Sequence, residues 1–531
     1  MWFLAWMPRA LAEGTNPLLT DRLNAPDGVN LMWNTAVPLI ALAVAPVTLL
    51  GAPILAYNVA LAGAVAMSGL ACFVACRRLA GGFAGPLVGG AVYALSPYMA
   101  SHAALHLPLV AVWGPPLFLV LLHELLVRRR SRPAFVGAGL GLLAALQILT
   151  AEELLATSAI AATVLAIVLA LLAPDRAALV DGARRIAVAA VPAALVFALV
   201  AGPALAVQFL GPQRVHAAVQ DPAVFSTVLL NVVVPTPYQL IAPPLGTEIS
   251  MDFSGLFHEA TAYLGLPLVL LLVGIVVVRW SDRRIRVAGV VGLAMLVLSL
   301  GPVLHVGVDA TAIPMPWSAF RQLPLLEHVL PGRLTLFTWL AVAVIVAIVV
   351  QGLLVERPAR AAPRLALLGG ALLLALPAPL AYTEVDVPPV FAAWDEAGIP
   401  GDATILFAPH FTNGAGAAPM LWAAVAGARP RMVEAYAYVP DEDGKPRFGP
   451  APTQLTRIMD TIQDDGSSIV ARGGVREQTL QDLADARVTH VVVGPMPNRP
   501  QMVAFFTDLL GGPPQERGGL DVWPIGSTPA G

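Results

Sequence analysis

Two histidines in the stretch SHAALHLP, His102 and His106, carry side chains suited to metal chemistry. They are four residues apart, so a helix would present both imidazole rings on one face. Neutral imidazole is a good ligand for divalent cations, but a protein site needs at least a third ligand. That ligand is not evident from the sequence, and an ordinary role at a membrane interface is the alternative for this pair.

Paired carboxylates occur in the stretch TAEELLATS, where Glu152 and Glu153 separate two apolar runs with almost no loop. We therefore expect at least one of them close to bilayer depth, where ionisable groups are costly and often functional. A side chain that snorkels to the water boundary is the alternative. Asp21 and Asp27 follow Glu13 in the first segment, but Asp and Asn are also frequent turn residues in stretches such as NAPDG.

Cationic groups are concentrated in WSAFRQLPLLEHVLPGRLTLF, which contains Arg321, Glu327, His328 and Arg333. Arg333 begins an apolar run, so its guanidinium is expected at headgroup depth. An arginine there can hold a phosphate through two parallel, charge-assisted hydrogen bonds. An anchor that pairs with Glu327 or with lipid is the alternative. Weaker candidates come from the long loop between 209 and 258 and its end: Asp252, His258 and Glu259.

These residues belong to a chain with the composition of an integral membrane protein. Hydrophobic residues make up 57% of the 531 positions and charged residues only 12%, against roughly 45–50% and about 25% in soluble domains. Apolar runs that could cross about 30 Å of hydrocarbon predict ten spans: 51–76, 83–100, 109–127, 134–150, 154–174, 186–208, 259–279, 286–305, 333–355 and 365–382.

Two further features of the composition argue against other kinds of chemistry. Lys445 is the only lysine, and the bias towards arginine reflects a GC-rich genome rather than nucleic-acid binding. Cys72 and Cys76 are one helical turn apart within a span, where a disulfide is geometrically awkward and packing is the expected role. The chain has no Gly-rich nucleotide loop, zinc pattern or catalytic serine elbow, which argues against energy coupling by bound ATP.

Arginines mark one side of the predicted spans. Every second loop carries them: Arg77, Arg78; Arg128, Arg129, Arg130, Arg132; Arg176, Arg184, Arg185; Arg279, Arg283, Arg284, Arg286; Arg357, Arg360 and Arg364. The positive-inside rule makes these loops cytoplasmic, so the first fifty residues and everything after 382 are predicted to be extracytoplasmic. Nothing in the first fifty residues would export them. We therefore expect a further span upstream of Met1, with a genuine amino-out start as the alternative.

The two ends of the chain differ from the apolar middle. Trp2, Phe3, Trp6 and Met7 form an apolar stripe typical of an interfacial helix. After residue 382, the segments ATILFAPH, RMVEAYAYV, VTHVVVGPM and GLDVWPI predict strands that alternate with helices in LTRIMDTIQ and MVAFFTDLLG. The sequence thus predicts an extracytoplasmic first loop over 1–50, a polytopic α-helical transmembrane domain over 51–382 and an extracytoplasmic α/β domain over 383–531.

This order of parts resembles the GT-C superfamily of membrane glycosyltransferases, in particular large bacterial members with a carboxy-terminal extracytoplasmic domain. The resemblance lies in the first loop, in NTAVPLIALAVAPVTLLGAPILAYNVALAGAV, in a span that ends CRRLAGG and in AVYALSPYMASH. It covers most of residues 1–382 as architecture and rests on loose motifs.

The resemblance implies a plasma-membrane enzyme that moves a sugar from a polyprenyl-phosphate carrier to a cell-envelope glycan or glycolipid. It implies a carboxylate base in the first extracytoplasmic loop, often close after the first span, a place that here would fall before Met1. Asp21 and Asp27 are the nearest matches, with Glu152 or Glu153 as a second acid that supports the acceptor or a divalent cation. A phosphate leaving group needs cationic stabilisation, which Arg333 or Arg321 would supply, with His102, His106, Glu327 and His328 in support.

Two other classes of function fit the same features. A transporter or flippase of lipid-linked sugar would need no base, but it should show polar residues deep in several spans, and the predicted spans are nearly free of charge. A non-catalytic envelope assembly protein would fit a chain that lacks its first-loop acid.

Overall fold

The computed structural model describes residues 1–217, 220–255, 257–320, 326–356, 358–381, 384, 386–411 and 417–525. The chain forms two compact units. Unit 1 comprises Met1–Val59, Pro203–Val219 and Thr383–Gly531, and unit 2 comprises Ala60–Gly202 and Gln220–Tyr382. The first segment, predicted as a domain of its own over 1–50, thus shares a unit with the carboxy-terminal region.

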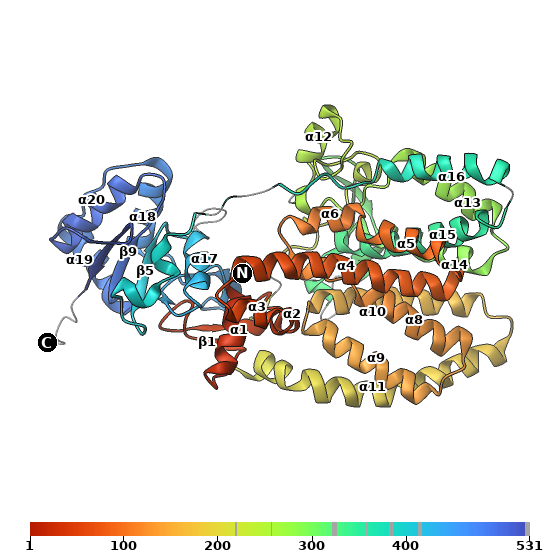
Figure 1. Ribbon diagram of the computed structural model, residues 1–531, viewed down its shortest axis with the longest axis horizontal. Coiled ribbons are helices and arrows are strands. Elements are labelled where there is room, and N and C mark those ends of the chain that lie inside the picture. Colours follow the sequence, from red (N-terminus) through yellow and green to blue (C-terminus); the bar gives the residue numbers. More distant parts are fainter. Residues whose placement is uncertain are drawn as a thin grey trace. The chain divides into compact units, whose positions relative to one another are not determined.

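Unit 2 is built from apolar helices (Figure 1). Among the described residues, five helical segments are long and apolar enough to cross a membrane: Pro53–Ala80 (α4), Leu107–Arg128, Glu152–Leu171 (α10), Arg176–Leu210 (α11) and Pro331–Leu353. The segment at Leu107 contains α7 (Leu107–Val110) and α8 (Gly114–His123), and the segment at Pro331 contains α15 (Thr335–Leu353). These helices agree with the membrane protein that the composition predicts.

Five of the ten predicted spans contain shorter helices: α5 (Ala84–Ala94), α9 (Pro133–Ile148), α13 (Leu266–Val278), α14 (Arg283–Ser299) and α16 (Pro358–Leu373). Local chain signals explain two of these differences. Ser96 caps a new helix, α6 (Pro97–Ala103), by accepting a hydrogen bond from the Met99 N–H, and Pro97 begins it, which divides the predicted span 83–100. Gly265, with a φ of 78°, precedes α13, so that helix begins at 266 rather than at 259.

Close helix packing in unit 2 depends on glycine. A Cβ at Gly89 of α5 would lie 2.8 Å from the Ala343 carbonyl oxygen of α15, and Gly85 also approaches the α15 backbone. Cys72 and Cys76 of α4 are free and buried, and the Cys76 sulfur lies 3.7 Å from the same Ala343 oxygen. The small residues let three helices approach closely, as expected for helices that pack inside a membrane.

The arginine-rich loops of unit 2 contact one another. Arg78 pairs with Glu124, Arg129 pairs with Asp181 at 2.6 Å, and Arg284 donates to the Leu79 carbonyl oxygen at 2.9 Å. Four of the five loops that were assigned to one side from sequence therefore meet at one end of the unit. Which side of a membrane that end faces stays a prediction.

Unit 1 contains a sheet in the order β10-β11-β9-β5-β6. The strands β5 (Thr404–Ala408), β9 (His490–Val493) and β6 (Arg431–Met432) are parallel, and β11 (Leu520–Pro524) and β10 (Gln515–Arg517) are antiparallel. Four of these strands lie in the segments predicted as strands, and the two predicted helices are α18 (Gln454–Asp465) and α20 (Arg499–Leu510). The α/β character of this region is confirmed.

Both faces of the sheet are buried. Residues along a strand point alternately to opposite faces, so neighbouring residues of β5 belong to two different cores. Leu406 and Ala408 belong to one core with α18, α19 (Gly473–Asp485) and α20, which lie on one face (Figure 1). Ile405 and Phe407 belong to a second core, which includes residues of α17 (Ala418–Val425) and α1 (Trp2–Ala12).

The first segment completes this second core. Trp2 and Trp6 stack with ring centroids 5.6 Å apart and are only 2% and 4% exposed. Residues 22–25 also bond to the sheet edge, because the Ala25 N–H donates to the Met432 carbonyl and the Met432 N–H donates to the Arg22 carbonyl. The prediction of an interfacial helix at residues 2–7 is therefore wrong, since its tryptophans are buried in protein rather than placed at a lipid boundary.

Candidate functional site

Arg333 lies between two carboxylates in unit 2. Its Nε and Nη2 donate to the two oxygens of Glu259 at 3.1 and 2.6 Å, and its Nη1 pairs with Glu153. Glu153 also accepts a hydrogen bond from the Leu330 N–H at 3.2 Å. The side chains of Arg333 and Glu259 are 11% and 8% exposed. Two planar groups in bidentate contact, largely withdrawn from solvent, form a strong and well-oriented pair.

Three elements hold this group in place. Glu153 is in the first turn of α10, Arg333 is in the short helix Pro331–Leu334 that leads into α15, and Glu259 ends the short helix Phe257–Glu259. The hydroxyl of Thr335 in α15 donates to the Gly332 carbonyl and shares a 2.7 Å hydrogen bond with Thr261, which fixes the segment after Glu259 against the start of α15. The ion pairs of Arg333 with Glu153 and Glu259 therefore depend on the packing of these three helix ends against one another.

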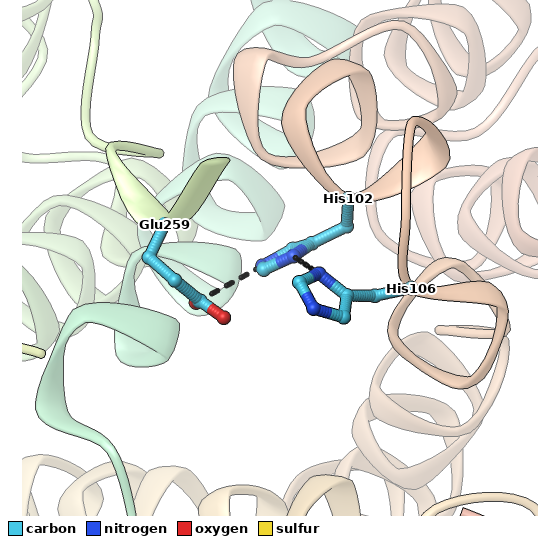
Figure 2. A group of neighbouring side chains, drawn as sticks. All are labelled: His102, His106 and Glu259. Carbon is cyan, nitrogen blue, oxygen red and sulfur yellow. Dashed lines mark hydrogen bonds and ion pairs between the residues drawn. The ribbon is translucent and has the colours of Figure 1, made fainter. Parts of the chain in front are cut away.

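The two histidines lie beside Glu259 (Figure 2). His102 and His106 face each other with their Nδ1 atoms 3.4 Å apart, and the His102 Nε2 is 3.9 Å from Glu259 Oε2. His102 is fully buried, and its Nε2 has no hydrogen-bond partner among the described residues. His102, His106 and Glu259 each offer one ligand atom, and these atoms lie within 4.8 Å of one another.

Burial and charge set the protonation of the cluster. Burial lowers the pKa of His102 to about 3, so its imidazole is neutral. Burial opposes ionisation of Glu259, but the Arg333 guanidinium lowers the pKa of this carboxyl to about 2. Glu153 pairs with the same guanidinium, so two carboxyl groups share one cationic side chain.

A mostly apolar pocket is lined by the helices that follow Glu153 and Arg333. Phe337, four residues after Arg333, and Ser158, five after Glu153, both line it. The pocket continues between α8, α10, α14 and α15 and reaches Arg283 and Arg284. Its apolar lining includes Phe118, Leu165, Val291 and Leu340. The pocket thus extends along α10 and α15 to the arginine-rich end of unit 2, and both of these helices belong to segments long enough to cross a membrane.

A family model matches residues 4–323. The chain belongs to the family described as Domain of unknown function (DUF6311). No curated protein matches the chain. The part matched by the DUF6311 model includes His102, His106, Glu153 and Glu259, and it ends ten residues before Arg333.

The structure brings together only some of the residues singled out from sequence. Arg333, Glu153, His102 and His106 meet in the cluster, whereas Glu152 is exposed beside it. The other candidates have different surroundings. Glu327 and His328 form an exposed pair at 3.7 Å, Asp21 pairs with Arg431 at 2.6 Å in unit 1, and the Asp27 carbonyl accepts from Gln213. Arg321 lies outside the described residues.

Glu259 is the main participant that sequence reasoning undervalued. It was one of three weak candidates, together with Asp252 and His258, and the alternative partner proposed for Arg333 was Glu327. The neighbouring His258 bonds to Tyr238 instead of joining the cluster. The signal that pointed to Glu259 was its position just before an apolar run, the same signal that singled out Glu153 and Arg333.

Proposed function

We propose that this protein is a membrane glycosyltransferase that moves a sugar from a polyprenyl-phosphate donor to a cell-envelope glycan or glycolipid. The observation that carries the proposal is the mostly apolar pocket between α8, α10, α14 and α15, whose lining includes Phe337 and Ser158, four and five residues after Arg333 and Glu153. A lipid-linked sugar has the same two-part character, because an apolar chain leads directly to a phosphate. The resemblance to GT-C enzymes supports the same reading.

The position of the charged group agrees with chemistry at a membrane face. α10 begins at Glu152 and ends before the arginine-bearing segment at Arg176, while the other end of α15 contacts Gly85 through Gln351, close after Arg77 and Arg78. Glu153 and Arg333 are therefore at the ends of their helices away from the arginines. By the positive-inside rule that end is extracytoplasmic, and two helix N-termini there add partial positive charge that favours a phosphate.

In the proposed reaction, Glu153 is the base and Arg333 holds the donor phosphate. Two N–H groups of Arg333 bond to Glu259, and a third pairs with Glu153. Arg333 has five N–H groups, so two remain that can bind phosphate. Glu153 takes the proton of the acceptor hydroxyl, the acceptor oxygen bonds to the anomeric carbon, and the bond from that carbon to the phosphate oxygen breaks. The electron pair leaves with the lipid phosphate, whose charge Arg333 stabilises.

The experiment is a transfer assay on full-length protein in lipid nanodiscs, with radiolabelled polyprenyl-phosphate sugars and an envelope glycolipid extract as acceptor. We expect label to appear in the acceptor fraction. Glu153→Gln should lower the rate about 10²–10⁴-fold, the usual contribution of a general base, whereas Glu248→Gln, an exposed glutamate of α12 (Pro244–Met251) in the same unit, should not. Equal rates for Glu153→Gln and wild type would contradict the assigned role, and no transfer from any donor would contradict the function.

A further inference from the structure

His102 has an unsatisfied nitrogen that points at a carboxylate. The distance from His102 Nε2 to Glu259 Oε2, 3.9 Å, is too long for a hydrogen bond. The nitrogen has no hydrogen-bond partner among the described residues although the side chain is fully buried. A buried polar atom without a partner is unfavourable, because it has lost its hydration and nothing replaces it. Something that binds both a nitrogen lone pair and a carboxylate oxygen would remove this penalty.

The charge of the surroundings favours a cation in that position. One guanidinium, that of Arg333, faces two carboxyl groups, those of Glu153 and Glu259. A water molecule would give His102 a hydrogen-bond partner but would place no positive charge opposite the second carboxyl group. A divalent cation would supply both the partner and the missing positive charge.

We propose that His102, His106 and Glu259 form a zinc site with an open fourth position. Two nitrogens and one carboxylate oxygen are a donor set that suits Zn²⁺, whereas Ca²⁺ and Mg²⁺ prefer oxygen ligands alone. Tetrahedral bonds of about 2.0–2.2 Å separate neighbouring ligand atoms by about 3.4 Å. The side chains approach that spacing, since His102 Nε2 is 3.9 Å from Glu259 Oε2 and one ligand atom from each of the three residues lies within 4.8 Å of the others.

Arg333 acts in this site as the group that orients a ligand. It bonds to both oxygens of Glu259, and Glu259 Oε2 keeps a lone pair for a cation. Such outer partners orient ligating carboxylates in metal sites. Tyr98 packs its ring edge on His102 at 4.4 Å between centroids, which restricts the rotation of that imidazole.

The test uses full-length protein with an affinity tag that contains no histidine. After treatment with a chelator and dialysis, zinc is titrated in competition with a chromophoric chelator, and the bound metal is measured by mass spectrometry. Cobalt is then added in place of zinc, because a tetrahedral cobalt site absorbs strongly in the visible range. We expect one zinc per chain, the cobalt band, and a melting temperature that rises when zinc is added.

Three variants make the result specific. His106→Ala removes a ligand that is only partly buried, so this variant should fold, and it should bind zinc about 100-fold more weakly or worse and lose the zinc-dependent rise in melting temperature. Glu259→Gln should have the same effect on binding. His216→Ala, an exposed histidine of unit 1, should bind zinc as wild type does.

The proposal is overturned if wild type binds less than one zinc per chain after reconstitution, if cobalt gives no tetrahedral band, or if His106→Ala binds zinc like wild type. None of these measurements requires an active enzyme. A failure of the zinc site is therefore distinguishable from a failure of the proposed glycosyl transfer.

Discussion

At the scale of single residues, Arg333 combines structural and chemical roles that one substitution can separate. Lysine would keep the positive charge but could not bond both oxygens of Glu259 and still reach Glu153 and a phosphate. We expect Arg333→Lys to lose about 2–4 kcal/mol of transition-state stabilisation, by analogy with the removal of an oxyanion donor, or roughly 30- to 1000-fold in rate.

The measurement is kcat with a lipid-linked sugar donor, on protein whose expression and melting temperature match wild type. Turnover near the wild-type rate would refute the phosphate-binding role of Arg333 and leave Arg321 as the candidate.

His410 in unit 1 makes stability depend on pH. Its Nδ1 lies 2.6 Å from Asp460 Oδ1, its Nε2 pairs with Glu434, and it follows β5. Burial opposes the charge, but the hydrogen bonds that the protonated imidazole donates to Asp460 and Glu434 raise the pKa of His410 to about 9. Because this pKa is above the ordinary value of about 6.5, the stabilisation is fully present below pH 6.5. It is lost as the pH rises through 9.

The expected loss is up to about 3 kcal/mol, the free energy that corresponds to a pKa of about 9 in place of the ordinary 6.5. Thermal unfolding between pH 6 and pH 10 should show a falling melting temperature for wild type. His410→Gln should flatten that dependence between pH 6.5 and 9. An unchanged slope in the variant would assign the pH dependence to other groups.

At the scale of elements, the α5–α15 contact depends on the absence of a side chain at Gly89. A Cβ there would lie 2.8 Å from both the Ala343 carbonyl oxygen and the Cys76 sulfur, closer than atoms can pack. We expect Gly89→Leu to push α5 away from α15 and destabilise the protein by about 1–3 kcal/mol or more. The melting temperature in detergent should fall by several degrees.

The matched control is Gly63→Leu, because Gly63 is also in a helix, α4, and a Cβ there would meet nothing within 4 Å. Its melting temperature should stay near that of wild type. If both variants lose stability equally, the close approach at Gly89 is not what holds the two helices together.

At the scale of the whole molecule, the prediction is the side of the membrane on which each segment lies. In a background with Cys72 and Cys76 changed to alanine, Glu442→Cys, in the DEDG loop after β7 (Tyr438–Pro440), should react with an impermeant maleimide on intact cells. Ser131→Cys, beside Arg130, should react only after the cells are opened. Both positions are exposed, so burial does not explain a difference, and the reverse pattern would overturn the topology.

The sequence by itself determined the class of the protein and much of its secondary structure. Apolar composition and run length indicated membrane helices, because the burial of apolar side chains in lipid is a local requirement on each helix. Alternation of apolar residues also located the strands β5, β9 and β11, since a strand buries its faces wherever its partners come from. Glu153 and Arg333 stand at the starts of apolar runs, and this position alone indicated both as candidate site residues.

Only the tertiary structure decided which of these residues meet. Arg333 pairs with Glu153, 180 positions earlier, and with Glu259, 74 positions earlier, and nothing in local periodicity encodes such a pairing. Trp2 and Trp6 have the pattern of a lipid-facing stripe, yet they are buried in a core with residues beyond 390. The reason is the same in both cases. A local pattern reports that a side chain needs an apolar surface or an opposite charge, whereas the packing of distant segments determines which one it finds.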